Sequence, residues 1–279
     1  MHPLLERIRS IERRHAQCRG DAAPAKPIGV LETGWASVDA AIGGGLTRGG
    51  LHEWLGNESA ATTSEVRQHA RNPWRPPLCV LVHLAWSALD ADRAGLWNVW
   101  IGRRCFPHPA VLLRGSVGDR TLLERSLFVS PLTPTDRLWA MDLALRSPAV
   151  GVVIGDGSEF DMAATRRVQL VAKNHETLAL LARPPWEHGE LSAAQTRWLV
   201  RQESVIHRDR SDSSNPQWRV ELLRCKGMRW EQAQGVWNLE WNRAACTLRV
   251  SASVADSAGD ASVASEPTQR RAMLDRQIA

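Results

Sequence analysis

The fold is decided by residues 33–64, which read TGWASVDAAIGGGLTRGGLHEWLGNESAATTS. A predicted short helix starts near Ser37 and Asp39, residue types that favour helix starts, and carries apolar residues on one face. Glycines 43–45 end this helix, because glycine enters the left-handed backbone region without a steric penalty. A glycine turn then leads into residues 51–55, which we interpret as an alternating strand. The stretch therefore predicts a helix, a glycine hinge and a strand in direct succession.

The strand runs into a segment that resembles the phosphate-binding loop G-x-x-x-x-G-K-[ST]. Gly56 supplies the first glycine, and Thr63 falls where the magnesium-binding hydroxyl belongs, but Ala61 replaces the second glycine and Thr62 the lysine. Because that lysine neutralises phosphate charge, we expect efficient nucleotide hydrolysis to be lost, whereas weak binding of ATP and magnesium stays open. A degenerate nucleotide site would be lined by Gly56, Glu58, Ser59, Thr62, Thr63 and Ser64.

The order of these motifs resembles the start of the RecA core. The matching positions are Thr33-Gly34, Ser37-Val38-Asp39, Gly43-Gly44-Gly45-Leu46, Gly49, Glu53 and Gly56-x-Glu58-Ser59. Three further blocks, residues 138–150, 167–170 and 219–227, resemble ImuA-type proteins, which are RecA-related members of the SOS mutagenesis cassette. This resemblance spans residues 33–227.

The resemblance implies an α/β fold with a RecA-like P-loop NTPase core, a mainly parallel sheet with helices on both faces and antiparallel edge strands. It also implies a non-catalytic adaptor in SOS-induced translesion DNA synthesis and DNA repair, which requires no cofactor. The implied partners are an ImuB-like, Y-family-related protein, an error-prone DNA polymerase and RecA. Direct contact with single-stranded DNA stays an open question.

Composition agrees with a cytoplasmic α/β protein. The chain has 279 residues, 43% of them apolar, and a formal net charge of +5, a mild excess that favours acidic partners. Five scattered cysteines give neither a zinc-ligand nor a disulfide pattern. The longest apolar run, residues 78–86, contains His83 and is too short to cross a bilayer, so we expect no membrane association.

The two ends of the chain differ from the core predicted over residues 28–251. Residues 1–19 form a predicted amphipathic helix with a basic outer face, and its apolar positions Leu4, Ile8 and Ile11 are candidates for partner binding. An Ala- and Pro-rich linker follows at 20–27. Residues 252–279 are predicted to be a disordered tail.

Within the core, helices and apolar strands alternate, which is typical of a parallel sheet. Helices are predicted over 78–93, 135–146 and 161–174, and strands over 97–101, 126–129, 149–154 and 177–182. A further helix is predicted over 192–200, with Ser192 as its cap. The period then changes to two, which predicts antiparallel strands at one sheet edge, over 203–207, 218–225, 236–241 and 246–251.

Several polar residues are candidates for function, and each also has a purely structural alternative. Asp156 either sits near the metal position of a nucleotide site or caps a loop. Arg183 and Trp186 could clamp a phosphate and stack a base, or could belong to a proline-stiffened surface turn. Gly102-Arg103-Arg104 stands where RecA-type enzymes carry their catalytic glutamate, so no general base is visible; these arginines either form a solvated turn or contact an acidic partner.

Three other functions stay open at this point. The chain could be a RecA-family ATP-dependent DNA-binding protein with a relocated lysine. It could be a stand-alone module for single-stranded DNA, which its charge and thirteen tryptophans permit. It could also be a cell-division inhibitor of the SulA type.

His83 is predicted to be a hydrogen-bonded core residue and His52 a strand residue.

Overall fold

A computed structural model describes residues 6, 29–58, 74–91, 95–113, 121–203, 215–228, 235–242 and 247–253. The predicted N-terminal helix with Leu4, Ile8 and Ile11, and the linker at 20–27, lie outside these ranges, apart from Glu6, which is helical. Of the predicted tail, Ala252 and Ser253 are described, and they belong to the last strand rather than to a disordered segment. No helix in the described part of the chain is both long and apolar enough to cross a membrane.

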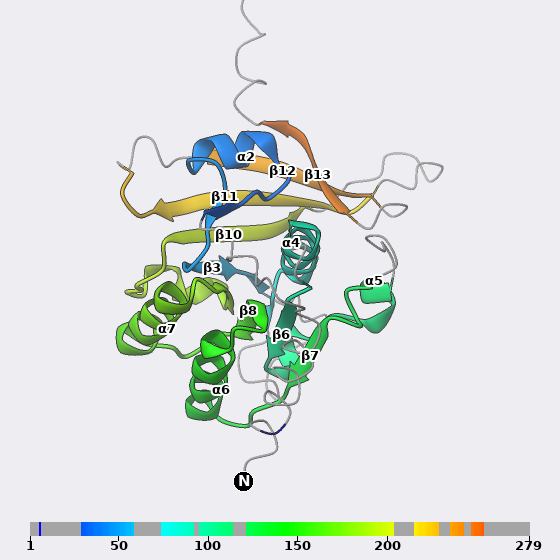
Figure 1. Ribbon diagram of the computed structural model, residues 1–279. Coiled ribbons are helices and arrows are strands. Elements are labelled where there is room, and N and C mark those ends of the chain that lie inside the picture. Colours follow the sequence, from blue (N-terminus) through cyan, green and yellow to red (C-terminus); the bar gives the residue numbers. More distant parts are fainter. Residues whose placement is uncertain are drawn as a thin grey trace, which may run out of the picture.

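The core is one nine-stranded sheet with the strand order β13-β12-β11-β10-β3-β9-β8-β6-β7 (Figure 1). The six strands from β10 to β7 run parallel, and β11, β12 and β13 continue the sheet antiparallel at one edge. The strand bounds are β3 Leu51–Leu55, β6 Trp97–Ile101, β7 Ser126–Val129, β8 Val150–Asp156, β9 Leu178–Arg183, β10 Thr196–Glu203, β11 Gln217–Cys225, β12 Gly235–Asn242 and β13 Thr247–Ser253. The predicted α/β class with antiparallel edge strands is confirmed.

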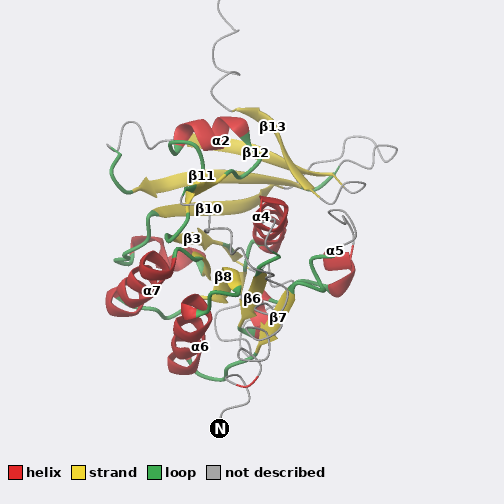
Figure 2. Ribbon diagram, in the orientation of Figure 1, coloured by secondary structure: helices red, strands yellow, loops and turns green. Residues whose placement is uncertain are grey.

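Two small strand pairs and the helices complete the fold (Figure 2). The pairs are β1 Val30–Leu31 with β2 Leu46–Thr47, and β4 Asn57–Glu58 with β5 Trp74–Arg75. The helices are α2 Ala36–Ala41, α4 Leu78–Ala91, α5 Pro109–Leu113, α6 Pro134–Arg146 and α7 Met162–His175, with 3-10 turns η1 Arg103–Cys105 and η2 Pro185–Gly189.

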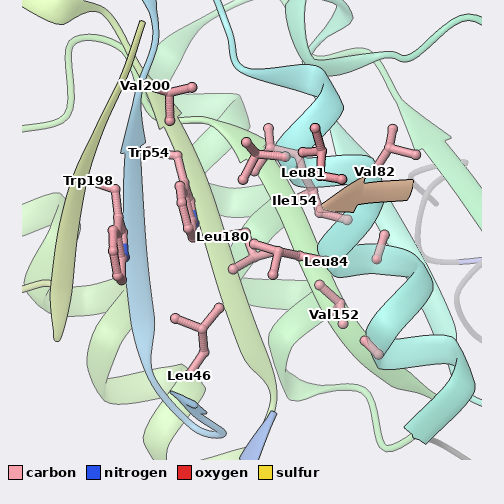
Figure 3. Packing of buried hydrophobic residues seen from close by; sticks show 14 of the residues in the cluster. Leu46, Trp54, Leu81, Val82, Leu84, Val152, Ile154, Leu180, Trp198 and Val200 are labelled. Carbon is pink, nitrogen blue, oxygen red and sulfur yellow. The ribbon is translucent and has the colours of Figure 1, made fainter. Parts of the chain in front are cut away.

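Helices cover both faces of the sheet. The apolar side of α4 packs on one face, where Leu81 and Leu84 meet the inward side chains of β8 and β9 (Figure 3). Trp54 and Trp198 lie on the same face and stack with ring centroids 5.1 Å apart. On the opposite face, α6 and α7 bury a second apolar cluster that includes Met141 and Val168. Because both faces are covered, all five residues of β3 are buried, so the predicted alternation of buried and exposed positions in this strand is wrong.

The start of α2 differs from the prediction. Its N-cap residue is Trp35, which makes no side-chain capping bond. The Asp39 carboxylate instead accepts hydrogen bonds from the backbone N–H of Thr33, at 2.9 and 3.1 Å. The glycine hinge is confirmed, because glycines 43–45 all have positive φ, from 81 to 138°. Gly45 also packs so closely against the carbonyl group of Leu31 that a side chain would collide with it.

The predicted helix over residues 192–200 is wrong. Strand β10 begins within this segment, at Thr196, and lies parallel to β3 and antiparallel to β11 inside the sheet. The physical reason is that β10 finds partners on both faces, Trp54 for Trp198 on one and Glu53 for Arg197 on the other. Ser192 caps no helix, since its hydroxyl donates to Glu53 Oε1 at 2.6 Å. The predicted strand over 203–207 is described only at Glu203, the last residue of β10.

Candidate functional site at the carboxyl edge of the sheet

Ligands of open α/β sheets bind beyond the carboxyl ends of parallel strands, so this edge is the candidate site. β3 ends at Leu55 and is followed by Gly56, whereas β8 ends at Asp156. One strand, β9, lies between them. The fold therefore brings the predicted glycine and the predicted metal-linked aspartate to the same edge.

Gly56 has a structural reason to be glycine. Its N–H donates to the carbonyl oxygen of Arg183 at 2.9 Å, and an added Cβ would collide with the carbonyl oxygen of Arg75. Asn57 and Glu58 then pair with Trp74 and Arg75 as an antiparallel ribbon. The first residues of the phosphate-loop-like segment are thus extended strand. Ser59, Thr62, Thr63 and Ser64 lie outside the described residues.

Asp156 is buried, and each of its two carboxylate oxygens interacts with other groups of the protein. Oδ1 accepts from the N–H and the hydroxyl of Ser158, at 3.0 and 2.6 Å. Oδ2 lies 2.7 Å from Arg137 Nη1 and 3.6 Å from Arg104 Nε. This arrangement favours the loop-capping alternative. A divalent ion would have to displace two guanidinium groups that already balance the carboxylate charge. Among the described residues, no group of three or more His, Cys, Asp or Glu side chains could hold a metal ion.

The η1 turn carries Arg103 and Arg104, which stand where the resemblance to RecA-type enzymes would place a catalytic glutamate. Gly102 begins this turn with φ 92°, and an added Cβ would lie 2.9 Å from the Cβ of Asp156. Arg104 lies over the Trp74 ring, 5.1 Å from its centroid, and donates to the Trp74 carbonyl at 3.3 Å. Arg103 Nε donates to Ser130 Oγ at 2.9 Å. The turn therefore places the Arg104 guanidinium beside Asp156, and none of its residues 103–105 has a carboxylate that could act as a general base.

Arg183 does not suit the predicted contact with nucleic acid. Its side chain is 1% exposed and donates to Glu53 Oε1, Glu187 Oε2 and the carbonyl of Phe160, at 2.9, 2.7 and 2.8 Å. Burial alone would lower the pKa of Arg183, but the charges of Glu53 and Glu187 raise it above its ordinary value. The guanidinium is therefore a buried structural cation. Trp186, in η2, is 41% exposed, and its stacking on a base stays a prediction.

Glu53 is the centre of a buried ion network that the sequence motifs did not reveal. Its carboxylate accepts from Arg183, from Arg197 Nε at 2.7 Å, and from Ser192. Arg197 also donates to the carbonyls of residues 187, 188 and 190. The network ties β9, β3 and β10 to the η2 turn. One sequence signal could have indicated it, namely a charged residue within or beside each of three otherwise apolar strand segments.

His83 lies in the core and His52 in the strand β3, as predicted, and both are buried. His83 Nε2 donates to the Thr33 carbonyl at 2.7 Å, and its Nδ1 accepts from the N–H of Leu248 at 3.3 Å. Burial lowers the pKa of His83, so the ring is neutral near pH 7. His52 bonds Thr196 Oγ1 and the Thr47 carbonyl, at 2.8 and 3.1 Å. Burial lowers its pKa to about 4, against a smaller opposing effect of the Thr47 hydrogen bond.

No family model matches the chain. Among curated proteins, the chain is similar to "Protein ImuA" of Caulobacter vibrioides in two strains, NA1000 / CB15N and CB 15. Each alignment has 26% identity over 227 residues and covers 75% of this chain and 84% of the relative. The similarity confirms the resemblance to ImuA-type proteins that the sequence motifs indicated.

Proposed function

We propose that the protein is a non-catalytic accessory protein of damage-induced mutagenesis. The observation that carries this proposal is the similarity to Protein ImuA over three quarters of the chain. In this role the protein works in the cytoplasm, where it helps to assemble an error-prone polymerase for translesion synthesis, and it does no chemistry on DNA itself. It requires no nucleotide or metal cofactor.

The proposed core is RecA-like. Support comes from the parallel strands β3 and β8, whose carboxyl ends carry the phosphate-loop-like segment and Asp156 at one edge. Helices on both faces and antiparallel strands at the far edge agree with the arrangement that the sequence resemblance implies.

The absence of catalysis rests on three local features. Thr62 replaces the lysine that nucleotide hydrolysis needs. The carboxylate of Asp156 is balanced by Arg137 and Arg104. Gly56 is required by the close approach of the Arg75 backbone. Together these features support a RecA-like fold that binds other proteins and no longer hydrolyses ATP.

The proposed partners are an ImuB-like, Y-family-related protein, an error-prone DNA polymerase and RecA. We assign the N-terminal segment of residues 1–19 a part in this docking, through Leu4, Ile8 and Ile11, because its sequence is amphipathic and is separated from the core by an Ala- and Pro-rich linker.

The test is an affinity purification of tagged protein from DNA-damaged cells, beside a variant that starts after Pro27. We expect the full chain to recover a Y-family-related protein, an error-prone polymerase or RecA, and the truncated chain to lose that partner. A midpoint of urea unfolding that matches the full chain is the control for the truncation. An empty eluate from well-folded full-length protein would contradict the adaptor role.

A further inference from the structure

Three exposed apolar side chains surround the start of α7, and the core described so far gives them no partner. They are Met162, Trp186 and Leu191, with exposed fractions of 43%, 41% and 75%. A single exposed apolar residue is ordinary on a protein surface, but several that belong to one region indicate a surface that is covered in use. We name these three residues the α7 apolar patch.

Hydrogen bonds bring Met162 and Leu191 to the same place. The Thr165 hydroxyl donates to the Met162 carbonyl at 3.1 Å and accepts from the N–H of Ala193 at 3.2 Å. Leu191 precedes Ala193 by two positions. One side chain therefore joins the first turn of α7 to the segment that carries Leu191.

The η2 turn, which carries Trp186, is tied to the start of α7 as well. The Glu187 carboxylate accepts from the N–H of Glu159, in the loop before α7, at 2.9 Å. Arg197 donates to the carbonyls of residues 187, 188 and 190, so the chain from η2 toward Leu191 is also fixed. The patch thus belongs to one hydrogen-bonded surface region.

Exposed carboxylates flank the patch. Glu159 and Asp161 precede Met162 in the chain, and Glu190 directly precedes Leu191. None of these three carboxylates forms an ion pair with another described residue. The nearby cations are fewer. They are Arg166, which is exposed on α7, and Arg224, which is half-buried and donates to two backbone carbonyls. The surroundings of the patch are therefore acidic on balance.

Residues 1–19 match both properties of the patch. Their sequence places Leu4, Ile8 and Ile11 at helical spacing, and it contains five arginines against two glutamates. Apolar side chains of this segment can cover the patch while its arginines lie near the carboxylates. A nucleic acid fits less well, because the same carboxylates repel its phosphates.

The described core begins close to α7. The Gly29 carbonyl accepts from the N–H of Arg48 at 3.0 Å. The next residue, Gly49, lies so close to the last turn of α7 that an added Cβ would be 3.3 Å from the Cα of Lys173. The chain therefore enters the core beside the C-terminal end of this helix.

The chain before Gly29 is long enough to reach the other end of α7. The helix rises about 17 Å between Lys173 and Met162. Residues 20–28 can span up to about 30 Å when extended. Residues 1–19 can therefore reach the patch of their own chain.

We propose that residues 1–19 dock on the α7 apolar patch of their own chain, with their apolar side chains against the patch. The contact covers the side chains that bind a partner in the proposed function, so a partner must displace them. That consequence rests on the proposed function, whereas the contact itself does not. Its test uses the purified protein alone, so the contact can fail while the purification from damaged cells recovers a partner, and the reverse.

The test measures hydrogen exchange of the full-length protein by mass spectrometry. We expect slowed exchange of the amides in residues 4–14. Met162→Glu and Leu191→Glu should each speed this exchange about tenfold, because a carboxylate removes the apolar contact and adds repulsion to none of the arginines that remain. Leu132→Glu is the matched control, since Leu132 is an exposed leucine outside the patch, and it should have no effect.

The contact also predicts the reciprocal effect. Ile8→Asp should speed the exchange of amides in residues 186–191, whereas Ser10→Asp, which lies off the apolar stripe of the same segment, should not. Glu190→Lys tests the charge and should speed exchange in residues 4–14, with Glu203→Lys as its control on exposed β10.

Three results would overturn the proposal. The first is fast exchange throughout residues 4–14 of the original chain. The second is slowed exchange that neither Met162→Glu nor Leu191→Glu changes. The third is protection that grows with protein concentration, which would assign the contact to a second copy. An unchanged midpoint of urea unfolding shows that each variant keeps its fold.

Discussion

At the scale of single residues, the two buried carboxylates Glu53 and Asp156 are each paired with arginines from other elements of the fold. Glu53 meets Arg183 and Arg197, which follow it by 130 and 144 positions. Asp156 meets Arg137 from α6 and Arg104 from η1. Such partners cannot be read from local spacing. The sequence identified Asp156 and Arg183 as unusual, but their surroundings decide that both have structural roles.

Glu53→Gln should destabilise the fold strongly. The change removes the negative charge that balances two buried guanidinium groups, and uncompensated buried charges cost about 3–5 kcal/mol. Urea unfolding followed by circular dichroism measures the loss. Glu203→Gln, at the exposed end of β10, is the control and should stay within about 0.5 kcal/mol of the original chain. An equally small effect at Glu53 would contradict the network.

The stability of the protein should depend on pH through His52. Its pKa is about 4 in the folded chain, against an ordinary value of 6.5. The unfolded chain therefore binds more protons between these values, and the free energy of unfolding should fall by about 3 kcal/mol as pH drops from 6.5 to 4. His83 acts in the same direction, since its pKa is also lowered. Urea titrations at several pH values measure this slope, and His52→Gln should flatten it. A flat profile of the original chain would contradict the assignment.

Gly56→Ala tests whether this glycine serves packing. An added methyl group would collide with the Arg75 carbonyl, so we expect a loss of about 1–3 kcal/mol in the free energy of unfolding. Gly29→Ala is the matched control, because nothing lies within 4 Å of an added Cβ there. If both variants unfold at the same urea concentration, the close approach of β5 to Gly56 is not the reason for the glycine.

At the scale of elements, strands and helices with strong local signals were predicted correctly, and the element that depends on distant partners was not. The helices α4, α6 and α7 and the strands β6, β8 and β9 agree with their predicted positions to within a few residues. The segment with β10 has a short apolar run that fits either a helix or a strand. Only its pairing with β3 and β11 decides the matter, and that pairing is not local.

The last strand is held to the core by an aromatic latch, formed by Trp35 and His83. The two rings stack 4.7 Å apart, Trp35 Nε1 donates to the Leu248 carbonyl at 3.0 Å, and His83 accepts from the Leu248 N–H. Trp35→Phe should cost about 1–2 kcal/mol through the lost hydrogen bond and packing. Hydrogen exchange should quicken in β13 while β3 amides keep their protection. Unchanged exchange in β13 would contradict the latch.

At the scale of the whole molecule, the sequence motifs predicted the α/β class, the parallel sheet and the resemblance to ImuA-type proteins. They also identified the two landmarks that the fold brings to one edge, Gly56 and Asp156. The motifs could not predict which groups surround Gly56 and Asp156 at that edge. These groups are Arg104, Arg137 and the β4–β5 pair, and they come from separate parts of the chain. In the proposed RecA-like core, Arg104 and Arg137 occupy the surroundings of Asp156 in place of a metal ion and a nucleotide.

The most direct test of this account is a calorimetric titration of the full-length protein with magnesium–ATP, with phosphate release measured on the same sample. We predict no saturable heat of binding up to millimolar nucleotide and no phosphate release above the uncatalysed background, because Thr62 and the pairing of Asp156 remove the two charges that the reaction needs. Micromolar binding of magnesium–ATP, with phosphate release that Asp156→Asn abolishes, would contradict this prediction. It would support the alternative of a RecA-family ATP-dependent DNA-binding protein.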